Sequence, residues 1–230
     1  MTPRQPFDNA LLNAGGLNLQ AVFDLADLPS TLVGQLDPAP AFGQLILLGH
    51  GGRAMWEAVQ AASVVSENPI DDFSRALVEQ WFATCLPARR HAIVYPGSST
   101  IGLQALGQLA GWHHASPFMV GINATWGSWY AYRAVVLADT DFTPTGIAPG
   151  VSPCLDCPHR ACVAGCPAGA LDGAAFSLTR CVAWRQRPDS SCRHTCLARC
   201  ACPVASQHRY SEEQMRHSYS ISLQMIEQCY

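Results

Sequence analysis

Cysteines carry the clearest chemical signal in this sequence, because nine of the eleven lie between Cys154 and Cys202. The first group has gaps of two, four and three residues and ends in a Cys-Pro pair. Closely spaced cysteines that end in Cys-Pro are typical of ferredoxin-like modules, whose thiolates hold an iron–sulfur cluster. The spacing therefore predicts iron–sulfur ligation. The first group consists of Cys154, Cys157, Cys162 and Cys166.

A second group repeats the Cys-Pro ending with different gaps. Two [4Fe-4S] clusters require eight thiolates, so one of the nine cysteines is spare or one cluster is bound irregularly. In two-cluster modules the cysteine before proline ligates the other cluster. The first three cysteines of the first group would therefore hold one cluster together with Cys202. Cys166 would hold the other cluster with three of Cys181, Cys192, Cys196 and Cys200. The spacing leaves open which member is spare. The second group consists of Cys181, Cys192, Cys196, Cys200 and Cys202.

Two other chemistries could explain the same cysteines. Zinc would use the four thiols of the first group, or would take His159 or His194 as a ligand. Disulfides suit secreted proteins, but the first residues contain no apolar signal segment and no apolar run reaches membrane-spanning length. We therefore expect a cytoplasmic protein without a membrane partner, in which dense thiols are metal or redox ligands.

Composition and charge narrow the classes of partner. The 230 residues are 49% hydrophobic and carry a net charge of −3, which indicates a packed core and gives no strong attraction to nucleic acid. Nucleic acid is therefore not expected as a partner. Arginines gather near the second cysteine group, where they either solvate the surface and offset the charge of reduced clusters, or form a docking face for an acidic electron donor. They are Arg180, Arg185, Arg187, Arg193, Arg199 and Arg209.

The first 145 residues alternate strand-like and helix-like segments, which predicts an α/β domain with a mixed sheet. Asp71 and either Ser98 or Ser99 are candidate helix N-caps. The Pro/Gly-rich stretch 143–153 predicts a linker. The expected strands are 17–25, 42–50, 91–96, 117–124 and 128–139, and the expected helices are 71–86 and 98–112.

These boundaries predict three parts of the chain. An α/β cofactor-binding domain covers 1–145, an iron–sulfur domain covers 150–210, and a C-terminal helix covers 211–230. Ser211 and Gln214 have the spacing of a capping box at the start of that helix.

Residues 103–139, followed by the cysteine region, resemble epoxyqueuosine reductases and the related corrinoid-dependent reductive dehalogenases. The matching pieces are Leu109-Ala110-Gly111-Trp112, Trp126-Gly127-Ser128-Trp129 and Arg180-Cys181. The resemblance implies a nitroreductase-like domain that binds cobalamin, followed by a small ferredoxin-like domain. Two [4Fe-4S] clusters in the second domain would pass electrons to the cobalt.

The resemblance also points to individual residues. In epoxyqueuosine reductases an aspartate donates a proton about seventeen residues before the tryptophan of the Gly-Trp pair, and counting back from Trp112 reaches Tyr95. His113, in place of part of the family's Trp-Ile-Gly-Lys stretch, is the second catalytic candidate. Trp112, Trp126 and Trp129 are candidates for the cofactor-binding wall, with core packing as the alternative.

Together these observations predict an iron–sulfur protein that transfers low-potential electrons to a cobalamin in its first domain for a reductive reaction. The expected partners are an electron donor such as ferredoxin or flavodoxin, and a small-molecule or corrinoid ligand. Two alternatives come from other classes. One is a non-catalytic redox partner or corrinoid-handling protein, and the other is a zinc-stabilised binding module.

Overall fold

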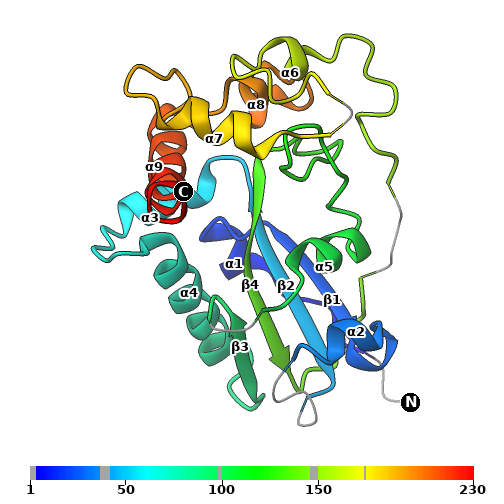
Figure 1. Ribbon diagram of the computed structural model, residues 1–230. Coiled ribbons are helices and arrows are strands. Elements are labelled where there is room, and N and C mark those ends of the chain that lie inside the picture. The colour runs from blue at the N-terminus through cyan, green and yellow to red at the C-terminus, as the bar shows by residue number, and fades with distance from the viewer. Residues whose placement is uncertain (1–3, 37–41, 98–99, 146–149, 174) are drawn as a thin grey trace. The chain divides into compact units, whose positions relative to one another are not determined.

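The computed structural model divides into two compact units, which are described separately. Unit 1 comprises Met1–Gly111 and Tyr130–Pro149, and unit 2 comprises Trp112–Trp129 and Gly150–Tyr230. Residues 112–129, which the sequence analysis assigned to the first domain, thus group with the cysteines. The structure describes residues 4–36, 42–97, 100–145, 150–173 and 175–230 (Figure 1).

Unit 1 is built on a four-stranded sheet with the order β1-β2-β4-β3, in which every neighbouring pair is antiparallel. The apolar run that predicted β2 is buried along its whole length, because β2 lies between two other strands. The expected mixed sheet is wrong for the described strands, since β1 runs antiparallel to β2, and β2 and β3 both run antiparallel to β4, which lies between them. The strands are β1 (Leu19–Asp24), β2 (Gln44–Gly51), β3 (His91–Tyr95) and β4 (Tyr130–Ala138).

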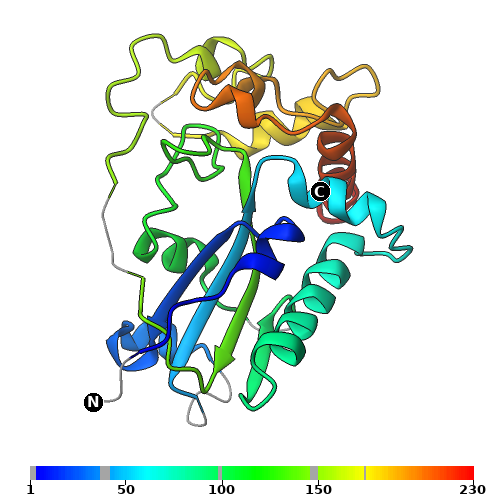
Figure 2. The ribbon, with the colours of Figure 1, turned by 180° about the vertical axis from the view of Figure 1, so that it is seen from behind.

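Helices cover both faces of this sheet (Figures 1 and 2). On one face α1, α3 and α4 bury Leu12, Met55 and Trp81 against the sheet. On the other face lie α2 and α5. The bounds are α1 (Ala10–Ala14), η1 (Leu25–Asp27), α2 (Ser30–Val33), α3 (Ala54–Ala61), α4 (Pro69–Cys85) and α5 (Leu103–Leu109).

Two helix starts differ from the sequence prediction. Helix α4 begins at Pro69 after the N-cap position Asn68, so the predicted cap Asp71 lies inside the first turn. Proline favours the first helical position because its missing N–H has no helical partner there. Helix α5 begins at Leu103, and the proposed caps Ser98 and Ser99 lie outside the described residues.

Unit 2 is made of short helices and loops, and its described residues contain no strand of the main sheet. The strand expected over 117–124 is wrong. Met119 has a left-handed φ of 65°, so the chain turns back and forms only isolated bridges, such as His114 with Ile122. The elements are α6 (Ala161–Ala164), α7 (Leu178–Gln186), α8 (Leu197–Ala201), η3 (Ser206–His208) and α9 (Glu212–Cys229).

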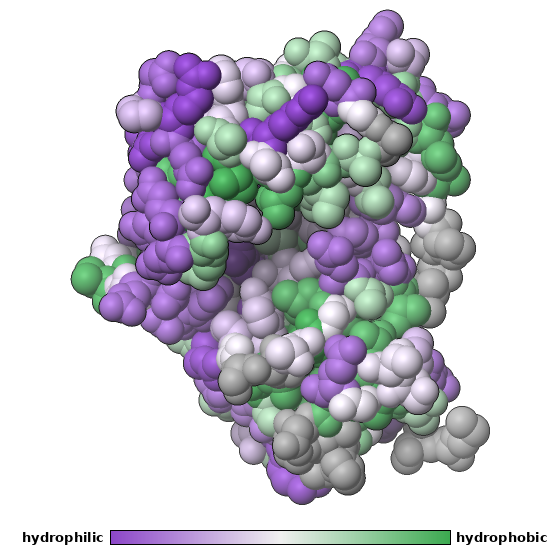
Figure 3. Space-filling model, viewed as in Figure 1, coloured by the Kyte–Doolittle hydropathy of each residue, from purple (hydrophilic) through white to green (hydrophobic). Residues whose placement is uncertain are grey.

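The expected C-terminal helix is present as α9. Ser211 is its N-cap, and the Ser211 hydroxyl accepts a hydrogen bond of 3.1 Å from the Gln214 N–H. Met215 and Leu223 form its buried side, while hydrophilic residues gather over it on the face seen in Figure 3. None of the helices in the described ranges combines the length and the apolar character that crossing a membrane requires.

Candidate metal centre

All nine cysteines predicted as ligands lie in unit 2, and every cysteine of the chain is a free thiol. Loops and the ends of short helices carry them. Eight of the nine gather into two sets of four, and each set mixes cysteines from both groups of the sequence.

Three members of the first thiol set, Cys154, Cys162 and Cys202, lie in a small apolar core with Phe118 and Ile122. Burial raises the pKa of the Cys154 thiol, and the nearby thiols of Cys202, Cys162 and Cys157 raise it further. The pKa of Cys162 is raised by its burial and by Cys202 in the same way. The last cysteine of the second group is therefore a close neighbour of the first three cysteines. The first thiol set consists of Cys154, Cys157, Cys162 and Cys202.

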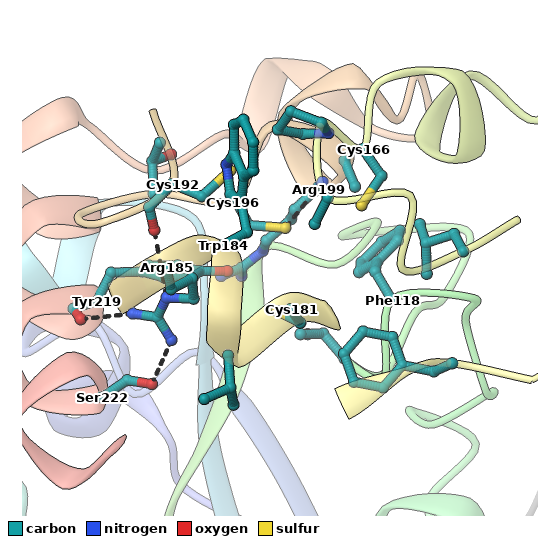
Figure 4. Close-up of a pocket in the computed structure, with 18 of the residues that line it drawn as sticks. Phe118, Cys166, Cys181, Trp184, Arg185, Cys192, Cys196, Arg199, Tyr219 and Ser222 are labelled. Atoms are coloured by element: carbon teal, nitrogen blue, oxygen red, sulfur yellow. Dashed lines mark hydrogen bonds between the residues drawn. The ribbon is translucent and has the colours of Figure 1, made fainter. Parts of the chain in front are cut away.

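The second thiol set lines a cavity of about 440 Å³ within unit 2 (Figure 4). Burial raises the pKa of Cys181; Arg185 lowers it, and the thiols of Cys166 and Cys192 raise it. Loss of water around Cys196 likewise raises the pKa of its thiol, and the thiols of Cys192 and Cys181 raise it further. The second thiol set consists of Cys166, Cys181, Cys192 and Cys196.

Helices α6 and α8 bring the two cysteine groups together. Cys162 lies in α6, Cys196 is the N-cap of α8, and Cys202 follows the end of α8. Gly165 allows the two helices to approach closely, because an added Cβ would lie only 2.8 Å from the Cβ of Ala201. This close contact explains how cysteines about forty residues apart can share one set.

Cys200 belongs to neither set. Its Sγ lies 3.7 Å from the Oγ1 of Thr195, and its side chain packs against a buried cluster formed by Trp129, Tyr210 and Met215. The sequence held one signal for this exclusion, which is the single residue between Cys200 and Cys202. That gap is shorter than any in the ferredoxin spacings.

Two of the six arginines near the second cysteine group are buried at the second thiol set, and the sequence pattern did not distinguish them from the other four. Arg185 is one of the two. It is only 6% exposed. Its guanidinium donates hydrogen bonds to the Cys192 carbonyl at 3.2 Å, to the Tyr219 carbonyl at 2.9 Å and to the Ser222 hydroxyl at 2.9 Å (Figure 4). It thereby joins α7, the cysteine loop and α9.

Arg199 is the other buried arginine and is also 6% exposed. Its guanidinium donates to the Ser128 carbonyl and hydroxyl. The guanidinium carbon lies 4.5 Å from the ring centroid of Trp129 and 4.9 Å from that of Tyr210, which is cation–π geometry. Its backbone N–H donates to the Cys196 sulfur at 3.5 Å.

The donor set of the second cavity fits a thiolate-bound cluster. Four soft sulfur ligands line it together with two buried cations. The indole N–H of Trp184, another lining residue, is buried without an acceptor among the described residues. A buried donor without an acceptor is costly unless a bound group supplies one.

The thiols of each set are close neighbours, but they do not converge on one point. In the described part of the chain, no group of three or more His, Cys, Asp or Glu side chains is arranged to hold a metal ion. The assignment of the cysteines as metal ligands therefore stays a prediction, supported by their grouping.

The two catalytic candidates lie in different units. Tyr95 ends β3 in unit 1, where burial raises the pKa of its phenol, the Asp71 carboxylate raises it further and Arg133 opposes the rise. His113 lies in unit 2 and is 8% exposed. Burial lowers the pKa of His113, and the adjacent His114 lowers it further.

The three tryptophan candidates have different surroundings within unit 2. Trp129 is fully buried and packs against Arg199 and Tyr210, so it serves as core here. Trp126 packs against His208, with ring centroids 4.4 Å apart. The Trp112 carbonyl accepts a hydrogen bond of 3.0 Å from the Asn123 side chain.

The chain shares its fold with two kinds of reductase of known structure. An epoxyqueuosine reductase solved with an epoxyqueuosine-modified tRNA-Tyr stem loop superposes with a TM-score of 0.54 at 12% identity, and the match covers 90% of this chain. The Bacillus subtilis epoxyqueuosine reductase gives 0.51 at 14% identity over 88% of this chain. A reductive dehalogenase whose structure suggests a mechanism for B12-dependent dehalogenation gives 0.52 at 13% identity over 95% of this chain.

These likenesses confirm, at the level of the fold, the resemblance drawn from the sequence. The chain spans 68% and 66% of the two epoxyqueuosine reductases and 34% of the dehalogenase. A scan with models of protein families finds no match, and a comparison with curated protein sequences also finds none.

Proposed function

We propose that this protein carries low-potential electrons through iron–sulfur clusters in unit 2 to a cobalamin in unit 1, for a reductive reaction. The observation that supports the clusters is the grouping of eight cysteines into two sets of four, each drawn from both sequence groups. In two-cluster modules the cysteine before proline ligates the other cluster, so each cluster is held by cysteines from both sequence groups. The likeness in fold to epoxyqueuosine reductases and reductive dehalogenases supports the reductive reaction.

Under this proposal each thiol set holds one [4Fe-4S] cluster, and residues 150–210 form a ferredoxin-like iron–sulfur domain. The clusters, when bound, supply one-electron carriers of low potential. The chain contributes the thiolates, the buried cavity of the second set and the hydrogen bond from the Arg199 N–H to the Cys196 sulfur. An external donor such as ferredoxin or flavodoxin supplies the electrons.

Cobalamin enters the proposal because one structural neighbour is described as B12-dependent. When bound, it supplies a redox-active cobalt. Tyr95 is the proposed proton donor in unit 1, because burial and the Asp71 carboxylate keep its pKa above the ordinary value of 10.0 and so leave the phenol protonated at neutral pH. Trp112, Trp126 and His113 lie in unit 2, and their part in binding a corrinoid stays a prediction.

The structural neighbours lead us to two substrate classes, and the first of them revises the expectation that nucleic acid is not a partner. One epoxyqueuosine reductase was solved with a modified tRNA stem loop, so RNA is retained as a partner class although the net charge argued against it. The other class is a halogenated organic compound, as in reductive dehalogenation. Turnover of reduced, cobalamin-loaded protein with each class decides between them.

The first experiment measures iron, sulfide, zinc and cobalt in protein purified without oxygen. About eight irons and eight sulfides per chain support two clusters. Zinc without iron contradicts the proposal and leaves a zinc-stabilised module.

A second measurement separates the enzyme from a carrier. Cobalamin is added to the iron-containing protein, and its absorption spectrum is recorded before and after addition of each substrate class. A changed corrinoid spectrum with turnover supports the reductase. Intact clusters with no change in the corrinoid spectrum support a non-catalytic redox partner.

A further inference from the structure

Unit 2 buries two guanidinium groups without a carboxylate partner. Arg185 and Arg199 are each 6% exposed, and neither takes part in any ion pair found among the described residues. Other arginines of the same region do pair with acids, namely Arg187 with Asp189 and Arg193 with Glu227. The two buried cations therefore differ from their neighbours in both exposure and partners.

A buried cation is costly when no anion compensates it. Carbonyl and hydroxyl oxygens accept hydrogen bonds from both guanidinium groups, and aromatic rings lie against both. These partners are neutral, so a net positive charge remains inside the unit. An anionic group bound nearby would compensate these two buried charges.

The second thiol set lies where that anion would be. Both arginines line the same cavity as its four cysteines (Figure 4). Arg185 acts electrostatically on Cys181, and Arg199 acts on Cys196. At Cys154 and Cys162 of the first thiol set, the largest influences on the pKa are burial and the neighbouring thiol of Cys202. The positive charge is therefore placed unequally between the two sets.

We propose that Arg185 and Arg199 raise the reduction potential of the cluster held by the second thiol set above that of the cluster held by the first. This inference rests on the proposed function. When the external donor loses one electron and a cluster gains it, the cluster becomes more negative by one charge. A buried cation stabilises that reduced form, and burial reduces screening by water and salt. The electron therefore resides preferentially on the second cluster.

The test is a redox titration of the whole iron-loaded protein, followed by electron paramagnetic resonance. In the wild type, two clusters of different potential are expected. Cys181→Ser, which removes a ligand of the second set, should abolish or alter the signal of higher potential. Loss of the signal of lower potential alone, or two equal wild-type potentials, overturns the proposal.

Charge removal tests the arginines directly. For Arg199→Gln we expect the ratio of reduced to oxidised second cluster at a fixed potential to fall about tenfold, which corresponds to about 59 mV for a one-electron couple. Arg199→Lys keeps the charge and should recover most of the shift, which a purely structural role would not predict. Arg187→Gln is the matched control, because Arg187 is exposed and already paired with Asp189.

The outcomes separate this inference from the proposed function. Wild-type protein without iron refutes the proposed function. Arg199→Gln protein with full iron and unchanged potentials refutes the role of Arg199, and Arg185→Gln is judged by the same criterion. If either variant loses iron, Cys181→Ser still tests which cluster has the higher potential in the wild type, and the reversed order overturns the proposal.

Discussion

At the scale of residues, Cys200 differs from the other eight clustered cysteines in what surrounds its sulfur. The two thiol sets contain sulfurs that influence one another, whereas the Cys200 sulfur lies beside Thr195 and an aromatic cluster. A thiolate ligand needs other ligands close by, because a cubane cluster is held by four sulfurs together. Cys200 lacks this arrangement, which supports the proposal that it is the spare thiol.

Serine substitution should therefore give different results at Cys200 and Cys181. Cys200→Ser is expected to retain the iron of the wild type, while Cys181→Ser should lose about half of it, because one of two clusters loses a ligand. Iron and sulfide analysis of anaerobically purified proteins checks this. Half of the iron lost from Cys200→Ser, with none lost from Cys181→Ser, would reverse the assignment.

His113 should make stability depend on pH. Burial holds its pKa in the folded protein below the ordinary 6.5, so below that pH the unfolded chain takes up a proton that the folded protein resists. This contribution is complete above pH 6.5 and is lost as the pH falls toward the lower, folded pKa. In His113→Gln the free energy of unfolding should fall less between pH 7 and pH 5 than in the wild type.

Denaturant unfolding at the two pH values measures this difference. His159→Gln, which replaces an exposed histidine of the same unit, is the control. Equal pH dependence in His113→Gln and the wild type would contradict the role of burial at this histidine.

At the scale of elements, the contact between α6 and α8 positions the thiol sets. Gly165 precedes Cys166 and lies against Ala201, which precedes Cys202. A Cβ at Gly165 would come within 2.8 Å of the Ala201 Cβ and 3.0 Å of the Ala161 carbonyl oxygen. These neighbours cannot rotate away, so the two short helices would have to separate.

Gly165→Ala should therefore destabilise unit 2 by about 1–3 kcal/mol, the usual cost of overpacking, and should lower iron retention. Thermal unfolding of the iron-loaded protein and iron analysis measure the two effects. Gly173→Ala is the matched control, because a Cβ there would meet nothing closer than 3.6 Å. Equal melting temperatures for the two variants would show that the helices adapt without cost.

At the scale of the whole molecule, the two units differ in what builds their cores. Unit 1 packs aliphatic and aromatic side chains from both its sheet and its helices. Unit 2 has smaller cores in which cysteines from both thiol sets take part. Its stability should therefore depend on the clusters in a way that the stability of unit 1 does not.

Removal of iron by a chelator and an oxidant should thus loosen unit 2 selectively. Hydrogen–deuterium exchange is expected to rise in 150–230 and 112–129, while β2 and β4 remain protected. The comparison uses iron-loaded and iron-free samples of the full chain. Equal loss of protection in β2 and β4 would show that the clusters stabilise the whole chain.

Local pattern in the sequence was sufficient for several elements of the fold. The apolar runs of β2 and β4 and the capped start of α9 were predictable, because burial of a strand and capping of a helix depend on adjacent residues. The segment 117–124 was not, because its strand-like composition is overridden by the turn at Met119. The antiparallel pairing of the strands was not predictable either, because it depends on the path that the connections between strands take in three dimensions.

For the candidate site, the sequence by itself determined the number of clustered thiols and predicted their ligand chemistry, since both follow from residue type and count. Only the tertiary structure decided that Cys200 lies apart from both thiol sets and that Arg185 and Arg199, out of six nearby arginines, are buried. The physical reason is that burial and proximity arise from contacts between distant segments. Here α9, the 112–129 segment and both cysteine groups determine together which side chains face the cavity.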